Sequence, residues 1–333
     1  MKGRLFTLKK TSSKKRRSRI VNWIFRIIIV FALGVLIFCA VKLLPKLLEY
    51  KASDDAFNKL KNNAVTDLDQ GDLLEDETEA DEPVEEESAP DTSNALGIDW
   101  EAFKGTDIVA WFQMDSISYP VMQSEDNEFY LHHLPDGSYN YGGSLFLYSE
   151  NDAMFTDQSS FIYGHNMNNG SMFGTLKNYT TDEYADHTFY LYLPDGTRHE
   201  YLFFSVALVG QTSQCYTWSF ANEESFLNWQ KWMKDSSMIN CVASIDATKN
   251  YVTLSTCNGY AGTDHRLVVC GQEQRVDKLQ EPASWYNDYA ERREANRNEN
   301  LDVANALEAE LSEQQRALRE DIYNVRHSVD SNE

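Results

Sequence analysis

The stretch TLSTCNGYAGTDHRLVVCGQ, residues 253–272, decides how the rest of the chain is interpreted. The residues before Cys257 favour a β-strand, and a polar loop containing Asn and Gly follows that cysteine. A second strand is expected over His265–Cys270. The pattern therefore places Cys257 at a strand end that a substrate can reach, and it brings Arg266 close to it across the hairpin.

Cys257 is the best candidate for a nucleophile among the five cysteines of the chain. A neighbouring cation such as Arg266 favours the thiolate, which is the nucleophilic form of cysteine. Cys215, Cys241 and Cys270 lack such surroundings, and the sequence leaves open whether they form disulfides. The cysteines show no CxxC or Cys/His ligand spacing, so we expect neither a metal site nor a cofactor.

A thiol nucleophile needs a proton-transfer partner, and His165 is the candidate among seven histidines. It ends the apolar run SSFIYGH, residues 159–165, and the polar run NMNNGS follows it. This places His165, like Cys257, where a strand meets a loop. A histidine at a strand end often has only a structural role, so the residues alone leave both roles open.

Residues 96–274 predict a mainly β domain. Short runs rich in Val, Ile, Tyr and Phe alternate there with Gly, Asn, Asp and Pro, which is typical of a β-barrel or a β-sandwich. The PDG at 194–196 predicts a hairpin. One helix is expected from Asn222, its N-cap, to Asp235, and it has an apolar stripe that should pack in the core. The stripe consists of Phe226, Trp229 and Met233.

The N-terminal part predicts a membrane anchor. Residues 20–44 are apolar and about long enough to span a bilayer, and a basic segment, residues 1–19, precedes them. A cleaved signal peptide would need small residues after the apolar run, but residues 42–46 are KLLPK. We therefore expect an uncleaved, single-pass signal anchor in the cell membrane. The positive-inside rule places residues 1–19 in the cytoplasm and the domain outside the cell.

Residues 45–95 are expected to form an acidic extracellular stalk. A short amphipathic helix is predicted over 45–65, whereas residues 66–92 contain many acidic residues and no Lys or Arg, which is typical of an extended, disordered segment. A cation-binding role is disfavoured because the run lacks a DxDxDG pattern. The tail, residues 276–333, is charged and helix-favouring. Gln314 interrupts its apolar repeat, so a surface helix and a partly disordered tail both remain open.

The charge of the chain excludes one class of partner. The formal net charge is −22, yet residues 1–44 contain eleven Lys and Arg and no acidic residue. The rest of the chain is therefore strongly acidic, and the two parts are expected to lie in different environments. Because phosphate binding needs a basic face, we do not expect nucleic acid as a partner.

The order GHN, TLSTC and Arg along the chain resembles the sortase family, the transpeptidases of Gram-positive bacterial surfaces. TLSTC, residues 253–257, matches the TLxTC signature of that family. The segments DIVAWFQMDSISYPVMQS at 107–124 and YGHNMNNGSMFGTLKNY at 163–179 resemble class B sortases in particular. So does the helix predicted between the hairpin and TLSTC. The resemblance covers about residues 98–274.

The resemblance implies an eight-stranded β-barrel with peripheral helices, residues 96–275, and a catalytic trio of Cys257, His165 and Arg266. It also implies a set of residues that bind the sorting peptide. These are Asn127, Leu131, Thr212, Tyr216, Ser255, Thr256 and Asn258.

The activity implied is acyl transfer through a Cys257 thioester. The enzyme would cleave a C-terminal sorting motif of a secreted protein after Thr, and an amine of a cell-wall peptide, supplied by a peptidoglycan precursor, would accept the acyl group. Two alternatives remain at this point. One is a sortase that polymerises pilins through a pilin lysine. The other is a non-catalytic surface adhesion or scaffold module.

Overall fold

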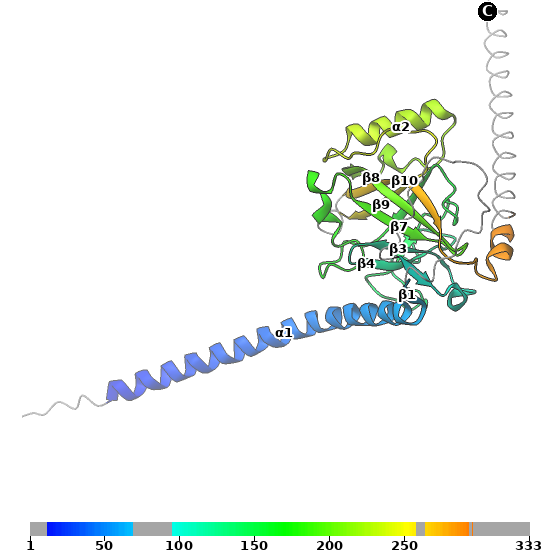
Figure 1. Ribbon diagram of the computed structural model, residues 1–333. Coiled ribbons are helices and arrows are strands. Elements are labelled where there is room, and N and C mark those ends of the chain that lie inside the picture. Colours follow the sequence, from blue (N-terminus) through cyan, green and yellow to red (C-terminus); the bar gives the residue numbers. More distant parts are fainter. Residues whose placement is uncertain (1–11, 69–94, 258–263, 293–294, 296–333) are drawn as a thin grey trace, which may run out of the picture.

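The computed structural model describes residues 12–68, 95–257, 264–292 and 295; side chains are described from Trp23 onward, except that of Cys257. A β domain sits at the end of one long helix, α1 (Ser12–Ala64), which extends away from it like a rod (Figure 1). A second α-helix, α2 (Glu223–Asp235), lies on the side of the domain opposite α1.

Eight strands close into a barrel, as expected from the sortase resemblance. Around the barrel their order is β10-β8-β7-β3-β4-β5-β6-β9. Two pairs, β4–β5 and β6–β9, are parallel, and the others are antiparallel. Closure pairs every strand on both sides and leaves no sheet edge exposed. The strands are β3 (Ile108–Met114), β4 (Ile117–Met122), β5 (Leu145–Leu147), β6 (Ser159–Tyr163), β7 (Thr188–Tyr192), β8 (Thr197–Gly210), β9 (Tyr251–Cys257) and β10 (His265–Lys278).

Short elements decorate the barrel. A two-stranded sheet joins the end of α1 to the domain, and short 3₁₀ helices lie in the connections. They are β1 (Val65–Asp67), β2 (Leu96–Ile98), η1 (Trp100–Phe103), η2 (Leu176–Tyr179), η3 (Asp182–Tyr184) and η4 (Gln214–Tyr216).

The predicted hairpin and helix are confirmed. Gly196 has a φ of +84°, which suits glycine, and it turns the chain from β7 into β8. The helix α2 begins after Asn222, whose side chain accepts a hydrogen bond from the Ser225 amide at 2.9 Å. Its apolar stripe is buried, as expected: Phe226, Trp229 and Met233 pack with residues of β8, β9 and β10.

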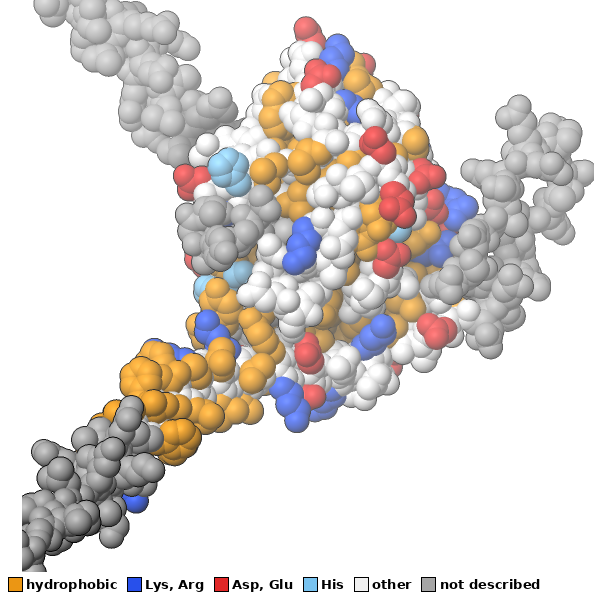
Figure 2. Space-filling model, turned by 90° about the vertical axis from the view of Figure 1, so that its left-hand side faces the viewer, with side chains coloured by type: hydrophobic (Ala, Val, Ile, Leu, Met, Phe, Trp, Pro, Cys, Tyr) orange, Lys and Arg blue, Asp and Glu red, His pale blue; other side chains and the backbone are white. Residues whose placement is uncertain are grey.

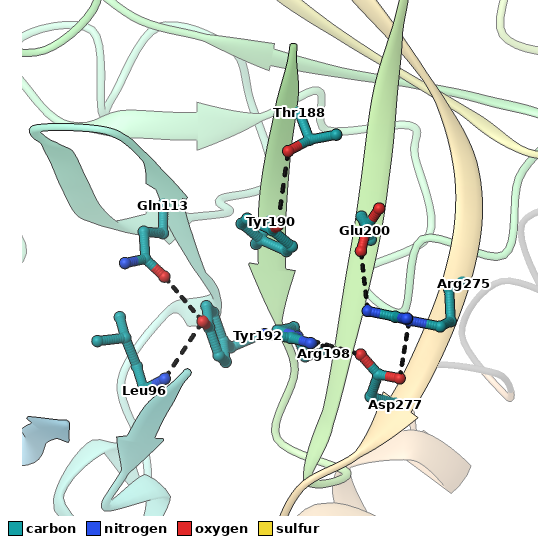
Figure 3. Close-up of polar contacts among 9 residues, drawn as sticks. All are labelled: Leu96, Gln113, Thr188, Tyr190, Tyr192, Arg198, Glu200, Arg275 and Asp277. Atoms are coloured by element: carbon teal, nitrogen blue, oxygen red, sulfur yellow. Dashed lines mark hydrogen bonds and ion pairs between the residues drawn. The ribbon is translucent and has the colours of Figure 1, made fainter. Parts of the chain in front are cut away.

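The barrel interior is an apolar core, and a polar network fixes the outer ends of several strands. Arg198 of β8 and Asp277 of β10 form a buried ion pair at 2.6 Å (Figure 3). Arg275, whose guanidinium also contacts Asp277 at 3.0 Å, links it to Glu200 at 3.1 Å. Nearby, the hydroxyl of Tyr192 donates to Gln113 and accepts from the Leu96 amide, so β7 is tied to β3 and β2.

The first part of α1 is apolar and exposed. From Trp23 onward it contains a stretch long and apolar enough to cross a membrane, and none of that stretch is buried in the domain. Figure 2 shows hydrophobic side chains covering the rod up to its junction with the domain. This is consistent with the membrane anchor predicted over residues 20–44.

The second part of α1 packs on the domain. Phe57 is buried, with its ring 5.1 Å from that of Tyr119 in an edge-to-face contact, and the Ala64 carbonyl accepts from the Asp99 amide. Residues 45–67, assigned above to the stalk, thus lie in α1 and β1. Residues 69–94 of the stalk lie outside the described part of the chain.

The domain also continues beyond residue 275. Strand β10 extends to Lys278, and Leu279 and Trp285 are buried against the strand β2 and η1. Residues 286–292 are helical. The remainder of the predicted tail lies outside the described residues, apart from residue 295.

Candidate active site

Strand register brings the three predicted catalytic residues to one end of the barrel. Strands β6 and β9 run parallel, with Tyr163 paired to Ser255. The Gly164 amide donates to the Ser255 carbonyl at 3.1 Å, which closes this last pair of the ladder. His165 follows Tyr163 by two residues, just past the end of β6, and Cys257 follows Ser255 by two residues, at the end of β9.

The register of β10 with β9 places Arg266 beside Cys257 as well, on the side of β9 that faces away from β6. Strands β9 and β10 are antiparallel, and Arg266 is the direct partner of Cys257. The hairpin predicted from the sequence is therefore confirmed in its strands. Residues 258–263 of its loop lie outside the described part of the chain, as does the Cys257 side chain.

An open pocket of about 380 Å³ lies at this end of the barrel. His165 and Arg266 both line it, together with Thr256, which immediately precedes Cys257. The other lining residues come mostly from β5, β6, β9 and the loops around them. They are Asn127, Leu131, Phe146, Tyr148, Phe161, Tyr163, Gly164, Gln211, Tyr216 and Ser255.

The residues expected to bind substrate fall into three groups. Five of them line the pocket: Asn127, Leu131, Tyr216, Ser255 and Thr256. Thr212 is described but is not among the lining residues. Asn258 lies outside the described residues.

Three of the five pocket residues take part in side-chain hydrogen bonds. The amide of Asn127 donates to the Ser149 hydroxyl and accepts from the Ser149 backbone, both at 2.9 Å. The hydroxyls of Tyr216 and Ser255 are 2.8 Å apart. By contrast, the buried hydroxyl of Thr256 has no hydrogen-bond partner within the described residues.

His165 is held by one backbone carbonyl. Its Nε2 lies 2.8 Å from the carbonyl oxygen of Leu131. Because a carbonyl oxygen only accepts, Nε2 must carry a proton, and Nδ1 is the nitrogen that can take up or release one. The contact fixes both the orientation of the ring and its tautomer.

Burial lowers the pKa of His165 below its ordinary value. The hydrogen bond to Leu131 opposes this shift, and the positive form of His132 adds to it. Two rings stack on His165: that of Tyr141 at 5.8 Å with planes 12° apart, and that of His132 at 5.7 Å. Neutral imidazole is thus the favoured form in the free protein near pH 7.

The three other cysteines of the β domain are unsuited to nucleophilic chemistry. Cys215 and Cys270 are fully buried, and burial raises the pKa of each thiol to about 12. Burial also raises the pKa of Cys241. All three are free thiols, which answers the disulfide question for these residues. A thiol with so high a pKa is almost entirely protonated at neutral pH.

The residues that surround His165 were not predicted from the sequence. Neither Tyr141 nor His132 was singled out, and the role of the Leu131 carbonyl could not be read from a side-chain pattern. One signal was present. His132 directly follows Leu131 in the run YLHHLPDG, and Leu131 was itself a candidate. A main-chain acceptor, however, leaves no mark on residue type.

Comparisons with known proteins agree with this geometry. The family model of the sortase domain matches residues 113–274. Sortase B of Listeria monocytogenes is 30% identical over 155 residues, which are 46% of this chain and 63% of that protein. Sortase B of Staphylococcus aureus is 26% identical over 174 residues, which are 51% of this chain and 71% of that protein.

A solved structure shows the same fold. The structure of a Staphylococcus aureus sortase B–substrate complex has a TM-score of 0.50 to this chain at 24% identity, over 54% of this chain and 85% of that one. At this level of identity the likeness is one of fold. Taken with the family match and the two sortase B relatives, it supports one conclusion: residues 113–274 of this chain form a sortase domain similar to those of class B.

Proposed function

We propose that this protein is a membrane-anchored cysteine transpeptidase. It cleaves a C-terminal sorting motif of secreted proteins after Thr and transfers the acyl group to an amine of cell-wall peptide. One observation carries the proposal. The register of β6, β9 and β10 brings His165, Cys257 and Arg266 to the same end of the barrel, beside an open pocket.

In the first half-reaction, Cys257 is acylated. The thiol proton moves to Nδ1 of His165, and the thiolate attacks the carbonyl carbon of the threonine in the sorting motif. Arg266 stabilises the negative charge on the carbonyl oxygen or orients the peptide. The imidazolium then protonates the leaving amine, and a thioester remains on the enzyme.

In the second half-reaction, an amine attacks the thioester carbonyl. His165 takes the proton of the attacking amine, and the proton returns to the departing sulfur of Cys257. A new amide forms and the free enzyme is restored. Splitting one amide exchange into two acyl transfers lowers the barrier of each step.

Substrate binding is assigned to residues around the pocket. Asn127, Leu131, Tyr216, Ser255 and Thr256 would contact the sorting peptide from the lining of the pocket. Thr212 and Asn258 complete the proposed set on the strength of the family resemblance alone.

The location of the reaction follows from the anchor. Residues 20–44 of α1 span the cell membrane, residues 1–19 remain in the cytoplasm, and the domain lies outside. The exposed apolar surface of α1 supports this placement. A tether to the membrane raises the effective concentration of secreted substrates that emerge there.

Peptide assays test the proposal. The chain is incubated with NPxTN-, SPxTG- or LPxTG-type peptides and with a cell-wall-type amine or a pilin-type lysine peptide. We expect a thioester mass shift on Cys257 and incorporation of the amine, and neither with Cys257→Ala.

The outcomes separate the alternatives. Preference for the lysine peptide would identify pilin polymerisation instead of wall anchoring. Hydrolysis without amine incorporation would identify a protease. No mass shift with any peptide would contradict the enzyme and favour the adhesion or scaffold module.

A further inference from the structure

The loop that holds the acceptor of His165 also touches the anchor helix. The side-chain amide of Asn140 donates to the carbonyl of Glu49 in α1 at 2.9 Å. Further along α1, Tyr50, Phe57 and Ala64 also contact the domain. Among these contacts, that of Asn140 is therefore the one nearest the apolar stretch.

Helix geometry gives the height of this contact above the bilayer. From Leu44, where the apolar run ends, α1 continues for five residues to Glu49, about 7–8 Å along the axis at a rise of about 1.5 Å per residue. The headgroup layer on each side of a bilayer is roughly 5–7 Å thick. For a helix that runs along the membrane normal, the contact of Asn140 with Glu49 thus lies at the outer edge of the headgroup layer.

An exposed aromatic patch lies on this loop. It consists of Phe129, His133, Tyr139 and Tyr141, and the exposed fractions of Phe129, Tyr139 and Tyr141 are 38%, 66% and 47%. Tyr139 and Tyr141 flank Asn140, which points inward to the helix. Solvent-exposed aromatic side chains in a group mark an interaction site, and Tyr in particular favours the membrane–water interface.

The patch is fixed before any partner arrives. The rings of Phe129 and His133 stack at 4.1 Å with planes 2° apart, and Tyr139 meets His133 edge-on at 5.8 Å. Main-chain hydrogen bonds from Asn140 to His132 and from Leu134 to Ser138 close the turn between them. Little conformational entropy is therefore lost when the patch is covered.

The patch continues the apolar surface of the helix. Leu43, Leu44, Leu47 and Leu48 of α1 are all exposed next to the junction. In Figure 2, hydrophobic side chains run from the rod onto the adjoining surface of the domain. Lys42 and Lys46 lie on the same stretch and can reach lipid phosphates.

We propose that the aromatic patch is a membrane-contact surface, which seats the domain on the headgroups of the outer leaflet. The proposal rests on the membrane anchor proposed above. Because the same loop carries the Leu131 carbonyl that holds His165, the seated domain presents its pocket close to the bilayer surface.

Photocrosslinking of the full chain tests this surface. The chain is reconstituted in phosphatidylcholine–phosphatidylglycerol vesicles with the photoreactive residue p-benzoylphenylalanine at Tyr139 or Phe129. Two reference positions are Leu36 within the apolar run and the exposed Asn228 on α2, which lies opposite α1 (Figure 1). After illumination, mass spectrometry measures phospholipid adducts.

We expect lipid adducts at Leu36, Tyr139 and Phe129, with yields at the patch roughly tenfold above that at Asn228. If lipid adducts formed at Leu36 but the adduct yields at Tyr139 and Phe129 were no higher than at Asn228, the membrane-contact surface would be overturned and the anchor would stand. Protein–protein crosslinks in place of lipid adducts at Tyr139 would overturn it too, in favour of a second copy. No adduct at Leu36 would overturn the anchor and the surface together, while the peptide assay for transpeptidation would stand independently.

Discussion

Gly143 controls the position of the acceptor that holds His165. Its φ is +53°, and a Cβ at this position would lie 2.4 Å from the Leu131 carbonyl oxygen and 2.5 Å from that of Tyr130. Both distances are far below van der Waals contact. Glycine is therefore required for the loop to close, and any side chain would displace the Leu131 carbonyl.

We predict that Gly143→Ala lowers kcat/KM for peptide cleavage by about tenfold or more, because His165 loses its fixed orientation. The matched control is Gly105→Ala. Gly105 has a similar φ of +77° but nothing within 4 Å of the added Cβ, so it should lose about 1–2 kcal/mol of stability with kcat/KM unchanged. Equal kcat/KM values in the two variants would show that the Leu131 carbonyl does not position the histidine.

The lowered pKa of His165 predicts the acidic limb of the activity profile. The reacting pair of Cys257 and His165 carries one proton in total, and a second proton on the pair inactivates it. Activity should therefore fall only as the pH drops below 6.5, through the lowered pKa of His165. The profile of kcat/KM against pH measures this limb.

Removing the ring that stacks on His165 should shift the acidic limb of the pH profile to higher pH. Tyr141→Ala exposes His165 to water, so its pKa rises and the acidic limb shifts towards pH 6.5. Tyr139→Ala is the control, because the Tyr139 ring makes a tilted contact with His132 at 6.1 Å and none with His165. A limb that stays in place in Tyr141→Ala would mean that His165 is not the group responsible.

For individual residues, the sequence predicted the functional side chains better than the groups that hold them in position. Cys257 and Arg266 follow from one hairpin, in which partners are close along the chain, and the structure has them as direct partners. The surroundings of His165 depend on a loop folded back from 34 residues earlier, through a main-chain atom. Such a contact is set by tertiary packing, which residue types in one sequence do not encode locally.

Among the elements, β8 and β10 depend on a buried charge pair. Both partners are almost inaccessible to solvent: the Arg198 and Asp277 side chains are 2% and 6% exposed. Removal of Asp277 takes away the carboxylate that balances the buried charge of Arg198.

We predict that Asp277→Ala lowers the free energy of unfolding by about 3–5 kcal/mol. Glu200→Ala serves for comparison, because its ion pair with Arg275 is more exposed and should contribute about 0–1 kcal/mol. Denaturant unfolding of both variants measures the two values. Similar losses would show that burial does not set the strength of this network.

The elements themselves were largely predictable. Strand β9 and helix α2 follow from residue preferences and from the Asn222 cap, and both occur where expected. The predicted strand from His265 to Cys270 is much too short, however, because β10 continues to Lys278. Its second half is polar in sequence and is held by pairing with β8 and by Asp277, so periodicity could not reveal it.

For the whole molecule, α1 contributes to the stability of the domain as well as to its location. Phe57 is buried in the main apolar core and contacts Tyr119, although it lies in the segment that we assigned to the stalk. A helix that donates a core side chain is part of the folded unit.

Phe57→Ala should therefore destabilise the detergent-solubilised chain by about 3–5 kcal/mol. Leu48→Ala, on the same helix but exposed, should change its stability by no more than about 0.5 kcal/mol. Chemical denaturation followed by tryptophan fluorescence compares them. If Phe57→Ala had as little effect as Leu48→Ala, α1 would not be packed on the barrel in solution.

The overall architecture was predictable only with the family resemblance. The many short strands predicted from the sequence are compatible with both a β-barrel and a β-sandwich. The barrel is closed by the parallel pairing of β6 with β9, which lie about 90 residues apart in the sequence, so local patterns could not predict it. The resemblance supplied the eight strands. It did not indicate that α1 would continue into the domain, because that segment lies outside the residues it covers.

The continuity of α1 from Ser12 to Ala64 has a rotational consequence. Each residue of an α-helix turns the chain by about 100°. Because α1 is continuous, it fixes the rotation of the domain relative to the membrane anchor. One residue inserted between the apolar run and Glu49 would swing the pocket about a quarter of a turn around the membrane normal. A whole helical turn would restore its direction but lift it by about 5 Å. The length of this helix therefore determines the direction in which the active site faces around the membrane normal.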